Sequence, residues 1–482
     1  MNYKLQTKAK FSESKTSLFS KRRREPSHPA SVSFPGGTHP PGSKELTRES
    51  KIQPGPAGKQ VAIMLSQHIG AICEPLVEKK QQVQAGQKIG DCDAFVSATV
   101  HSPVNGKVKE IALRSHAVLG RGPAVIIETE PENNPPKQPC SAKFTSDFND
   151  DSYSAEQIRY AVRQAGIVGM GGAGFPTSVK VEPNPKAPKE AMIVNGCECE
   201  PYITCDYRIM LEWTNQIVAG VKLARKAAGC SEVFIGIEDN KPEAIEVMNT
   251  ALKTSANSDG IKVVPVKTKY PQGGERQLIK AILKKDVPTG GIPPMIGVLV
   301  LNVATTAAIA EAVVTDWPLT HRVVTVTGEG IVNPGNYYVP IGTSVAELIE
   351  FCGGLREEAV RIILGGPMMG IAIADLTTPT TKTTGAVTVL TEKQIGGAKF
   401  AGIQTPCIRC GRCLEACPEH LNPTKIAHAV KNNLLDVAES YYISACMECG
   451  CCSYLCPANI ELTGYIKTGK ILLARQKKKM PQ

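Results

Sequence analysis

Apolar and polar residues follow different periods in different parts of the chain. In residues 74–111, valines and isoleucines alternate with polar residues and are interrupted by glycine turns, a pattern typical of short β-strands. In residues 154–166 the period is helical, with Ser154 placed to cap the helix and an apolar face that includes Ile158 and Val162. The pattern predicts a β-rich region followed by a region that contains helices.

The middle of the chain alternates strands with helices. Within residues 191–317, the runs AMIVNG, EVFIGIE, IKVVPV and IGVLVLNV are typical of strands separated by helical stretches, which predicts an α/β domain. The most apolar window, residues 295–314, contains Asn302 and Glu311. It therefore predicts a buried strand followed by a helix, and not a membrane span.

Two further regions follow the α/β pattern. Residues 321–354 predict a hairpin and then a helix capped by Thr343 or Ser344, which resembles the β-grasp module called SLBB. From about residue 401 the chain is rich in cysteine and helical. Residues 422–443 predict helices that pack beside the cysteine-rich turns.

The β-rich region resembles a known carrier fold. Residues 74–90 and 97–111 are similar to the two halves of a barrel-sandwich hybrid, the fold of lipoyl and biotinyl carriers. A carrier presents a modifiable lysine at the hairpin between the halves. The turn at 91–97, DCDAFVS, has no lysine, so a structural or docking role is favoured over a swinging arm.

Length and composition fit several small domains. The chain has 482 residues, enough for three or four cores, and its many glycines and prolines favour short strands and turns. We therefore predict a multidomain α/β and α+β fold. The predicted parts are a disordered basic tail (1–34), a barrel-sandwich hybrid (35–130), a linker (131–150), an α/β domain (151–318), an SLBB β-grasp domain (319–400), a cysteine-rich helical domain (401–470) and a basic tail (471–482).

The net charge of +10 is modest for this length and is partly carried by basic runs at 21–25 and 475–479. Such runs are usually solvated tails, and attraction to an anionic membrane surface is the functional alternative. Nothing in the pattern indicates base-specific nucleic-acid binding. The start of the chain lacks the apolar segment of a signal peptide, so we do not expect export. Seventeen cysteines in such a chain indicate a reducing compartment and metal binding.

The cysteines gather in two copies of one spacing. CIRCGRCLEACP (407–418) and CMECGCCSYLCP (446–457) both contain C-x2-C-x2-C-x3-C followed by proline. Three thiolates two residues apart can wrap three corners of an iron–sulfur cubane, and the fourth lies too far along to complete the same cube. Two such copies predict two [4Fe–4S] clusters. A pair of zinc knots, with tetrahedral ligands, is the weaker alternative.

In two-cluster ferredoxins the fourth cysteine of each copy ligates the other cluster. This predicts two ligand sets: Cys407, Cys410, Cys413 and Cys456 for one cluster, and Cys446, Cys449, Cys452 and Cys417 for the other. Cys451 falls outside the register. We expect it to be either a small buried residue beside the cluster or a modest tuner of the cluster potential.

A glycine-rich loop at 166–180, GIVGMGGAGFPTSVK, contains G-x-G-x-x-G at Gly169, Gly171 and Gly174. The dinucleotide fingerprint requires a strand before this motif, whereas a helix is predicted here, so a Rossmann interpretation fails. Two interpretations stay open. The glycines either let backbone N–H groups meet a phosphate or flavin edge, or form a turn packed tightly against a helix.

The order of several motifs resembles that of the FMN- and NADH-binding subunit of respiratory complex I. These motifs are GMGGAGFPTSVK, NGCECEPY, YPQGGERQ and LNVATTAAI. Over residues 34–470 the chain is more similar still to the RnfC family, the C subunits of Rnf electron-transport complexes, which adds GGTHPP, ILGGPMMG and the double cysteine motif in the same order. The resemblance implies FMN, NAD(H) and two [4Fe–4S] clusters. The basic extension at 1–33 is not part of the pattern.

The resemblance also implies roles for residues that match the family motifs. Residues implied to line the flavin and nicotinamide are Gly169, Gly171, Gly172, Gly174 and Phe175, with Lys180 near a phosphate. Residues implied to make polar contacts with flavin or nucleotide are Asn195, Glu198 and Glu200, followed by Glu275 and Asn302. Met170 stands where the complex I loop commonly has arginine, so phosphate contacts differ. Three nearby cysteines are expected to be buried thiols and not ligands: Cys197, Cys199 and Cys205.

The implied function is that of a peripheral subunit on the cytoplasmic face of the cell membrane. NADH donates a hydride and iron–sulfur clusters accept single electrons, so a flavin has to stand between them. The implied partners are other Rnf-type subunits, including membrane-embedded ones that move Na+ or H+, and a ferredoxin-like subunit. The coupling ion and the direction of electron flow stay open.

Two other functions remain as alternatives. One is a cobalamin reductase of the propanediol-utilisation type, in which the barrel-sandwich segment follows the flavin domain, whereas here it comes first. The other is a non-catalytic electron-wire or docking subunit with clusters but no nucleotide site.

Overall fold

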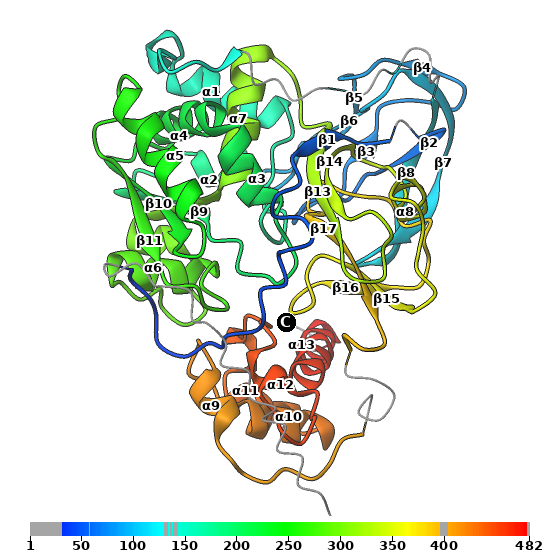
Figure 1. Ribbon diagram of the computed structural model, residues 1–482, viewed down its shortest axis with the longest axis vertical. Helices are drawn as coiled ribbons and strands as arrows, with labels where there is room; N and C mark the ends of the chain where they lie inside the picture. Colours follow the sequence, from blue (N-terminus) through cyan, green and yellow to red (C-terminus); the bar gives the residue numbers. More distant parts are fainter. Residues whose placement is uncertain are drawn as a thin grey trace, which may run out of the picture.

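The computed structural model describes residues 31–56, 58–129, 134, 137, 143–395 and 403–479. Figure 1 shows an α/β part in green beside a β-rich part in blue and yellow, with a helical part in orange and red below them. Residues 1–30 of the predicted basic tail, and most of residues 130–142 around the predicted linker, lie outside the described residues.

Two small sheets form the barrel-sandwich part. Their strand orders are β2-β8-β7-β4 and β3-β5-β6. The strands are β2 Gln60–Met64, β3 Glu74–Pro75, β4 Gln82–Val83, β5 Lys88–Asp91, β6 Val100–His101, β7 Gly106–His116 and β8 Gly120–Thr129. Val83, Ile89 and Val108 are buried in a shared core. The alternating pattern therefore predicted correctly that these residues form short strands with one buried face.

The α/β part is built on a parallel sheet of order β11-β10-β9-β12. Its strands are β9 Ala191–Gly196, β10 Glu232–Glu238, β11 Ile261–Val266 and β12 Val298–Asn302, which match the four predicted runs. Its helices are α1 Ala155–Gln164, α2 Thr177–Val181, α3 Cys205–Glu212, α4 Thr214–Ala228, α5 Pro242–Thr254, α6 Glu275–Leu283 and α7 Val303–Thr315. Ser154 caps α1 as predicted, through a capping box with Gln157.

The SLBB part is a mixed sheet of order β1-β14-β13-β17-β15-β16. Its elements are β13 His321–Thr327, β14 Gly335–Pro340, α8 Val345–Phe351, β15 Ala359–Leu364, β16 Ile371–Ile373 and β17 Ala386–Thr391. Of the two predicted caps for α8, Ser344 is the one observed, and it forms a capping box with Glu347. The edge strand β1 Ile52–Pro54 comes from within the range predicted for the barrel-sandwich part and pairs in parallel with β14.

Several short helices and one longer helix, α13, form the cysteine-rich part. They are α9 Arg412–Ala416, α10 Pro423–Lys431, α11 Leu435–Ser440, α12 Cys451–Tyr454 and α13 Leu462–Lys479. Their core contains Ile426, Ile443 and Leu473. Helices α10 and α11 lie where helices were predicted between the two cysteine motifs. The basic tail predicted over 471–482 is wrong in its start, because α13 continues through residue 471 to Lys479 and buries Leu473.

Residues 31–44, called here the N-terminal strap, connect the α/β part to the cysteine-rich part. Val32 forms a parallel bridge with Val266 of β11, and Thr38 forms an antiparallel bridge with Tyr270. Gly37 N–H donates to the carbonyl of Ala416 in α9, at 2.9 Å. In Figure 1 the strap is the dark blue segment that runs between the α/β part and the cysteine-rich part. The end of the tail predicted to be disordered is therefore hydrogen-bonded structure.

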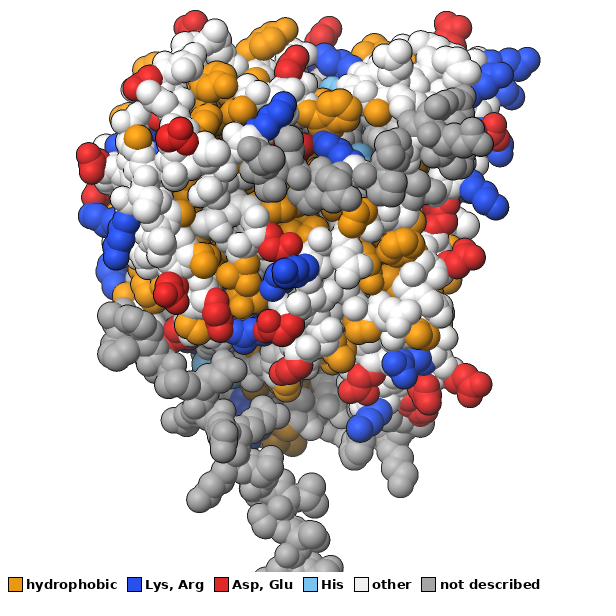
Figure 2. All heavy atoms as spheres, turned by 45° about the horizontal axis from the view of Figure 1, so that its top comes forward, with side chains coloured by type: hydrophobic (Ala, Val, Ile, Leu, Met, Phe, Trp, Pro, Cys, Tyr) orange, Lys and Arg blue, Asp and Glu red, His pale blue; other side chains and the backbone are white. Residues whose placement is uncertain are grey.

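Among the described helices, none combines the length and the apolarity that crossing a membrane requires. Figure 2 shows one face of the molecule, on which Lys and Arg side chains are interspersed with Asp and Glu side chains and with hydrophobic groups. The described surface on this face therefore carries both signs of charge.

Candidate functional site

The parallel sheet has a switch point between β9 and β12. From β9 the chain adds β10 and then β11 on one side, and it later returns to place β12 on the other side of β9. In open α/β sheets ligands bind outside the carboxyl ends of the strands at such a point. Asn195 and Asn302 lie there in register, as the last paired residues of the two strands.

The glycine loop lies directly over this point. A Cβ atom on Gly171 would stand 2.8 Å from Nδ2 of Asn302, so only glycine allows this approach. Met170 N–H donates to Oγ1 of Thr305 in α7, at 3.0 Å, and Gly172 faces open space. Helix α1 precedes the loop, so the prediction that a Rossmann fingerprint fails here is confirmed.

The two asparagines hold the loops around the switch point. Asn302 caps α7 by accepting from Ala304 N–H at 2.8 Å, and its amide donates to the Asp206 carboxylate at 2.6 Å. Asn195 donates to the carbonyl of Gly273 at 2.7 Å. The segment that follows β9 and the segment that precedes α6 are therefore fixed to the ends of the same two strands.

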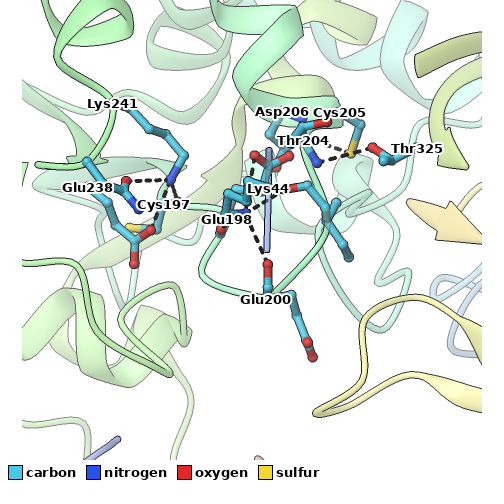
Figure 3. A network of polar contacts seen from close by, with 12 residues as sticks. Lys44, Cys197, Glu198, Glu200, Thr204, Cys205, Asp206, Glu238, Lys241 and Thr325 are labelled. Carbon is cyan, nitrogen blue, oxygen red and sulfur yellow. Dashed lines mark hydrogen bonds and ion pairs between the residues drawn. The ribbon is translucent and has the colours of Figure 1, made fainter. Parts of the chain in front are cut away.

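Two buried lysines hold the segment 197–203, which contains Glu198 and Glu200 (Figure 3). Lys44, from the N-terminal strap, donates to the carbonyls of Glu198 at 2.9 Å and Glu200 at 3.0 Å, and also to the carbonyl of Ile203. Lys241 donates to the carbonyl of Cys197 at 2.6 Å and to the carboxylate of Glu238 at 2.9 Å. Ammonium groups with three donors each thus replace water around the backbone of this segment.

Glu198 is the buried carboxylate of the site. One of its oxygens accepts from Asp206 N–H at 2.6 Å, and the other has no hydrogen-bond partner among the residues that the structure describes. The Lys44 ammonium lies 3.8 Å from that second oxygen. Burial raises the pKa of Glu198 and lowers the pKa of Lys44, and the attraction between the two opposes both shifts. This second oxygen, which the Lys44 ammonium faces without a hydrogen bond, can therefore accept one from a bound ligand.

Glu200 points away from Glu198 in Figure 3. Its two oxygens accept from the backbone N–H groups of Met368, at 3.2 Å, and Met369, at 2.8 Å, in the SLBB part. Burial raises the pKa of Glu200 to about 7, although these two N–H groups lower it. The structure therefore joins Glu200 to the SLBB part, which the sequence did not predict.

The remaining predicted residues surround the same edge of the sheet. Lys180 of α2 forms an ion pair with Glu275 of α6 at 3.0 Å and also donates to the carbonyl of Val300 at 3.1 Å. On the other side of the loop, the carbonyl of Gly174 accepts from Ile69 N–H of the barrel-sandwich part at 3.2 Å. The site is thus enclosed by three parts of the chain.

Near the α/β part, one pocket of the cysteine-rich part is lined by four of the predicted ligands: Cys417, Cys446, Cys449 and Cys452. Backbone N–H groups donate to two of these sulfurs, Leu421 to Cys417 at 3.3 Å and Glu448 to Cys446 at 3.3 Å. Such N–H donors favour thiolates over thiols, as cluster binding requires. The donor set therefore fits an iron–sulfur cluster held by these four residues.

Burial raises the pKa of Cys446 to about 12 and that of Cys452 to about 11. A metal must therefore displace protons when it binds here. Cys451 lines the same pocket and is fully buried. This buried position fits the first of its two predicted roles.

The other predicted set of cluster ligands is more exposed to solvent. Cys407 and Cys410 are exposed, Cys413 is buried in α9, and Cys456 is half-buried. Thr405 N–H donates to the carbonyl of Ala458 at 3.0 Å, so the segments before Cys407 and after Cys456 run side by side. Helices α9 and α12 are also in contact. This arrangement brings the fourth cysteine of the second motif toward the first.

Tyr270 joins the sheet edge to the four-cysteine pocket. It is almost fully buried, and its hydroxyl donates to the carbonyl of Cys449 at 2.8 Å. It packs with Cys449 and Cys451 on one side and with Cys199, beside Glu200, on the other. Nearby, Arg276 of α6 forms an ion pair with the buried Glu419 at 3.0 Å. The two candidate sites are therefore neighbours across one packed contact.

Sequence reasoning missed Lys44, Lys241 and Tyr270. Lys44 lies in a polar segment more than 150 residues before the backbone that it holds, and no local pattern connects them. Tyr270 was part of the quoted motif YPQGGERQ, but the motif does not show that it contacts a cluster loop. Of the three cysteines in NGCECEPYITC, Cys197 and Cys205 are buried and Cys199 is half-buried, and burial raises the pKa of all three thiols. Within the described chain, only Cys205 of these three has two possible metal ligands close by, Glu198 and Asp206.

Four family models match consecutive stretches of the chain. They are described as the RnfC barrel sandwich hybrid domain over residues 32–132, the Nuo51 FMN-binding domain over 162–311, the SLBB domain over 323–372 and the 4Fe-4S dicluster domain over 403–460. They confirm the predicted fold class and the order of its parts.

Several curated proteins are similar over most of the chain. The C subunit of a proton-translocating ferredoxin:NAD(+) oxidoreductase complex from Clostridium ljungdahlii is 42% identical, over 85% of this chain and 87% of that protein. The C subunit of a Na(+)-translocating ferredoxin:NAD(+) oxidoreductase complex from Acetobacterium woodii is 41% identical, over 84% of this chain and 89% of that protein. The C subunit of an ion-translocating oxidoreductase complex from Rhodobacter capsulatus is 40% identical, over 83% of this chain and 75% of that protein.

Among solved structures, an NAD+-reducing [NiFe]-hydrogenase in the H2-reduced state aligns with a TM-score of 0.46 and 20% identity. The alignment covers 71% of this chain and 64% of the hydrogenase chain, so this chain spans slightly less than two thirds of that neighbour.

Replacing Lys44 tests the support of the 197–203 segment. We expect Lys44→Met to lower the free energy of unfolding by about 2 kcal/mol or more, because three carbonyls and Glu198 lose a buried donor. Chemical denaturation of the purified chain measures this. Lys51→Met, at an exposed position shortly after the strap, is the control and should change little. Equal losses in both variants would contradict the assigned role of Lys44.

Glu200 is expected to make stability depend on pH. Its pKa is about 7 in the folded chain and 4.5 as a free side chain, so between these values the folded chain keeps a proton that the unfolded chain has lost. Stability from this group should therefore fall as pH rises from about 5 to about 7, by at most about 1.4 kcal/mol per pH unit.

Glu200→Gln removes this titration. The stability difference between wild type and Glu200→Gln should shrink as pH rises through that window, measured as thermal midpoints at a fixed scan rate. Glu357→Gln, at an exposed position, is the control and should give a difference independent of pH. A constant difference for Glu200→Gln would show that this carboxyl is ionised throughout.

Proposed function

The chain belongs to the RnfC family, the C subunits of Rnf-type ion-translocating oxidoreductase complexes, and from this membership we propose that it connects NAD(H) to single-electron carriers. In this role it exchanges hydride with NAD(H) at a bound FMN and passes electrons one at a time to two [4Fe–4S] clusters. The observation that carries the proposal is the direct contact through Tyr270 between the edge of the FMN-binding domain and a four-cysteine pocket.

The flavin site fits FMN at two points. The loop over the switch point has the close approach at Gly171 and the open space at Gly172 that a flat ring against the backbone requires. Glu198 offers a buried oxygen, without a hydrogen bond among the described residues, that can accept from a ring or ribityl donor. Bound FMN would supply the chemistry that amino-acid side chains lack, because it takes two electrons as a hydride and releases them singly.

The protein's own groups bind, orient and exclude water. Asn195 and Asn302 fix the loops that would contact the flavin, and Lys44 with Lys241 fixes the backbone that carries Glu198. Lys180 is held toward the sheet edge by Glu275, where its ammonium can meet a phosphate once that ion pair opens. We assign no side chain as general acid or nucleophile.

The proposed cluster ligands are the two interlocked sets. The pocket near Tyr270 supports Cys417, Cys446, Cys449 and Cys452 as one set. The paired segments at Thr405 and Ala458 support Cys407, Cys410, Cys413 and Cys456 as the other. Because two of the last four cysteines are exposed, a cluster that they held would lie near solvent, where a partner carrier could reach it.

We assign the subunit to the cytoplasmic face of the membrane, bound to membrane-embedded subunits and to a ferredoxin-like subunit. The names of the relatives support membership in a multi-subunit complex that moves ions. Two relatives of nearly equal identity are named for different ions, H+ and Na+, so similarity to this chain does not identify the ion.

Cofactor analysis tests the proposed function. The chain purified without oxygen should contain about one FMN and about eight iron atoms, and NADH should bleach the flavin absorbance. Eight irons without flavin would favour an electron-wire subunit. A flavin that NADH reduces and that then reduces cobalamin, in preference to a ferredoxin, would favour a cobalamin reductase.

Cysteine variants test the ligand sets. Cys451→Ala should keep both clusters, because this thiol is outside the register, whereas Cys456→Ala should damage the cluster built on Cys407, Cys410 and Cys413. Cys417→Ala should damage the other cluster, whose pocket it lines. Iron content and the EPR signals of the reduced protein measure each loss. Equal iron loss in Cys451→Ala and Cys456→Ala would show that the register is wrong.

A further inference from the structure

The turn at 365–370, Gly-Gly-Pro-Met-Met-Gly, belongs to the SLBB part but is bound to the segment that follows β9. The N–H groups of Met368 and Met369 converge on the two oxygens of Glu200, at 3.2 and 2.8 Å. A Cβ atom on Gly366 would stand 2.3 Å from the Glu200 carboxylate, so glycine is required at this point. Successive N–H groups on one carboxylate form a built anion-binding turn.

The other side of the turn lies on the four-cysteine pocket. The Met368 side chain packs against the cluster of Tyr270, Cys449 and Cys451. The carbonyl of Met368 would stand 3.0 Å from a Cβ atom on Gly450, which lies between two of the proposed ligands and has a φ of +83°. Met369, the next residue, is 44% exposed. One turn therefore contacts both the flavin-side segment and the cluster loop, and only one of its methionines faces the cluster.

We propose that the 365–370 turn, anchored by Glu200, is a positioning element for electron transfer between the flavin site and the cluster at Cys417, Cys446, Cys449 and Cys452. It holds Met368 against the cluster loop and keeps water out of the contact. The inference rests on the proposed function. Each NADH supplies two electrons as a hydride, and each transfer across this contact oxidises the flavin by one electron and reduces one cluster by one.

The physical basis is the apolar shell of a metal site. Such a shell controls solvent access and local dielectric, and thereby the redox potential of the metal. Together with Tyr270 and Met447, Met368 forms the apolar wall on the flavin side. Its removal admits water, which stabilises the more negative reduced cluster and makes the potential more positive. It also loosens the loop that fixes the separation of the two centres.

The main test compares Met368→Ala with Met369→Ala in the complete, cofactor-loaded chain. After rapid mixing with NADH, Met368→Ala should bleach its flavin at the wild-type rate and reduce its clusters about tenfold more slowly, because the loosened contact between the two centres slows transfer more than the more positive cluster potential speeds it. A redox titration followed by EPR should show a more positive potential for one cluster. Met369→Ala should match wild type in all three measurements, because its side chain faces solvent.

The proposal is overturned if Met368→Ala keeps the wild-type cluster reduction rate and potential, or if Met369→Ala changes them equally. If NADH does not bleach the flavin of the wild-type chain, the proposed function fails instead. The EPR titration, with a chemical reductant in place of NADH, then still decides whether Met368 affects the cluster.

Hydrogen exchange tests the anchor without any turnover. Above about pH 8, where Glu200 is ionised, the amide protons of Met368 and Met369 should exchange faster in Glu200→Gln than in wild type, because an amide side chain offers one acceptor oxygen where the carboxylate offers two. Mass spectrometry of a peptide that covers residues 364–371 measures this, with Glu357→Gln as control. Unchanged exchange in Glu200→Gln would remove Glu200 from the proposal.

Discussion

The shape of the candidate site depends on one buried ammonium group. The segment 197–203 contains two non-glycine residues with positive φ, Glu198 at +50° and Tyr202 at +71°, a conformation that persists only where the surroundings enforce it. Lys44 enforces it by donating to three carbonyls of this segment. Because Lys44 ends the N-terminal strap, the same chain segment that bridges β11 and contacts α9 also shapes the flavin-side backbone.

Short sequence patterns predicted those features that depend only on residues close together in the chain. The four parallel strands, the cap at Ser154, the cap of α8 to within one residue and the missing strand before the glycine loop all follow from short stretches of sequence. Pairings between distant residues were not predictable in this way. Lys44 with Glu198, Glu200 with the 365–370 turn, and β1 with β14 each join segments far apart in the chain. In the sequence these pairings are marked only by a lone lysine, a glutamate among cysteines and a three-residue strand. Such features are too common to identify a distant partner.

The glycine loop shows how one motif can serve different geometry. In a dinucleotide fingerprint the glycines bring the backbone to a pyrophosphate at a helix start. Here Gly171 leaves room for the Asn302 side chain at the end of β12. Gly174 has positive φ, and a Cβ atom on it would stand 2.8 Å from Thr383 of the SLBB part. A Cβ atom on Gly169 would have no neighbour closer than 3.6 Å, so sterics do not require glycine there. The spacing of the glycines therefore matches the dinucleotide fingerprint, but the contacts around them differ from those that the fingerprint requires.

The contact between the α/β part and the cysteine-rich part is fixed at several independent points. Interfaces between domains of one chain are usually mobile, but electron transfer needs a constant separation of the two centres. Here Gly37 bonds Ala416, Tyr270 bonds Cys449, and Arg276 pairs with Glu419, whose side chain is 9% exposed. Removing Arg276 would leave a buried carboxylate with one fewer partner, which makes opening at this point costly. Because these contacts lie on different segments, sliding the two parts past each other would have to break all three of them.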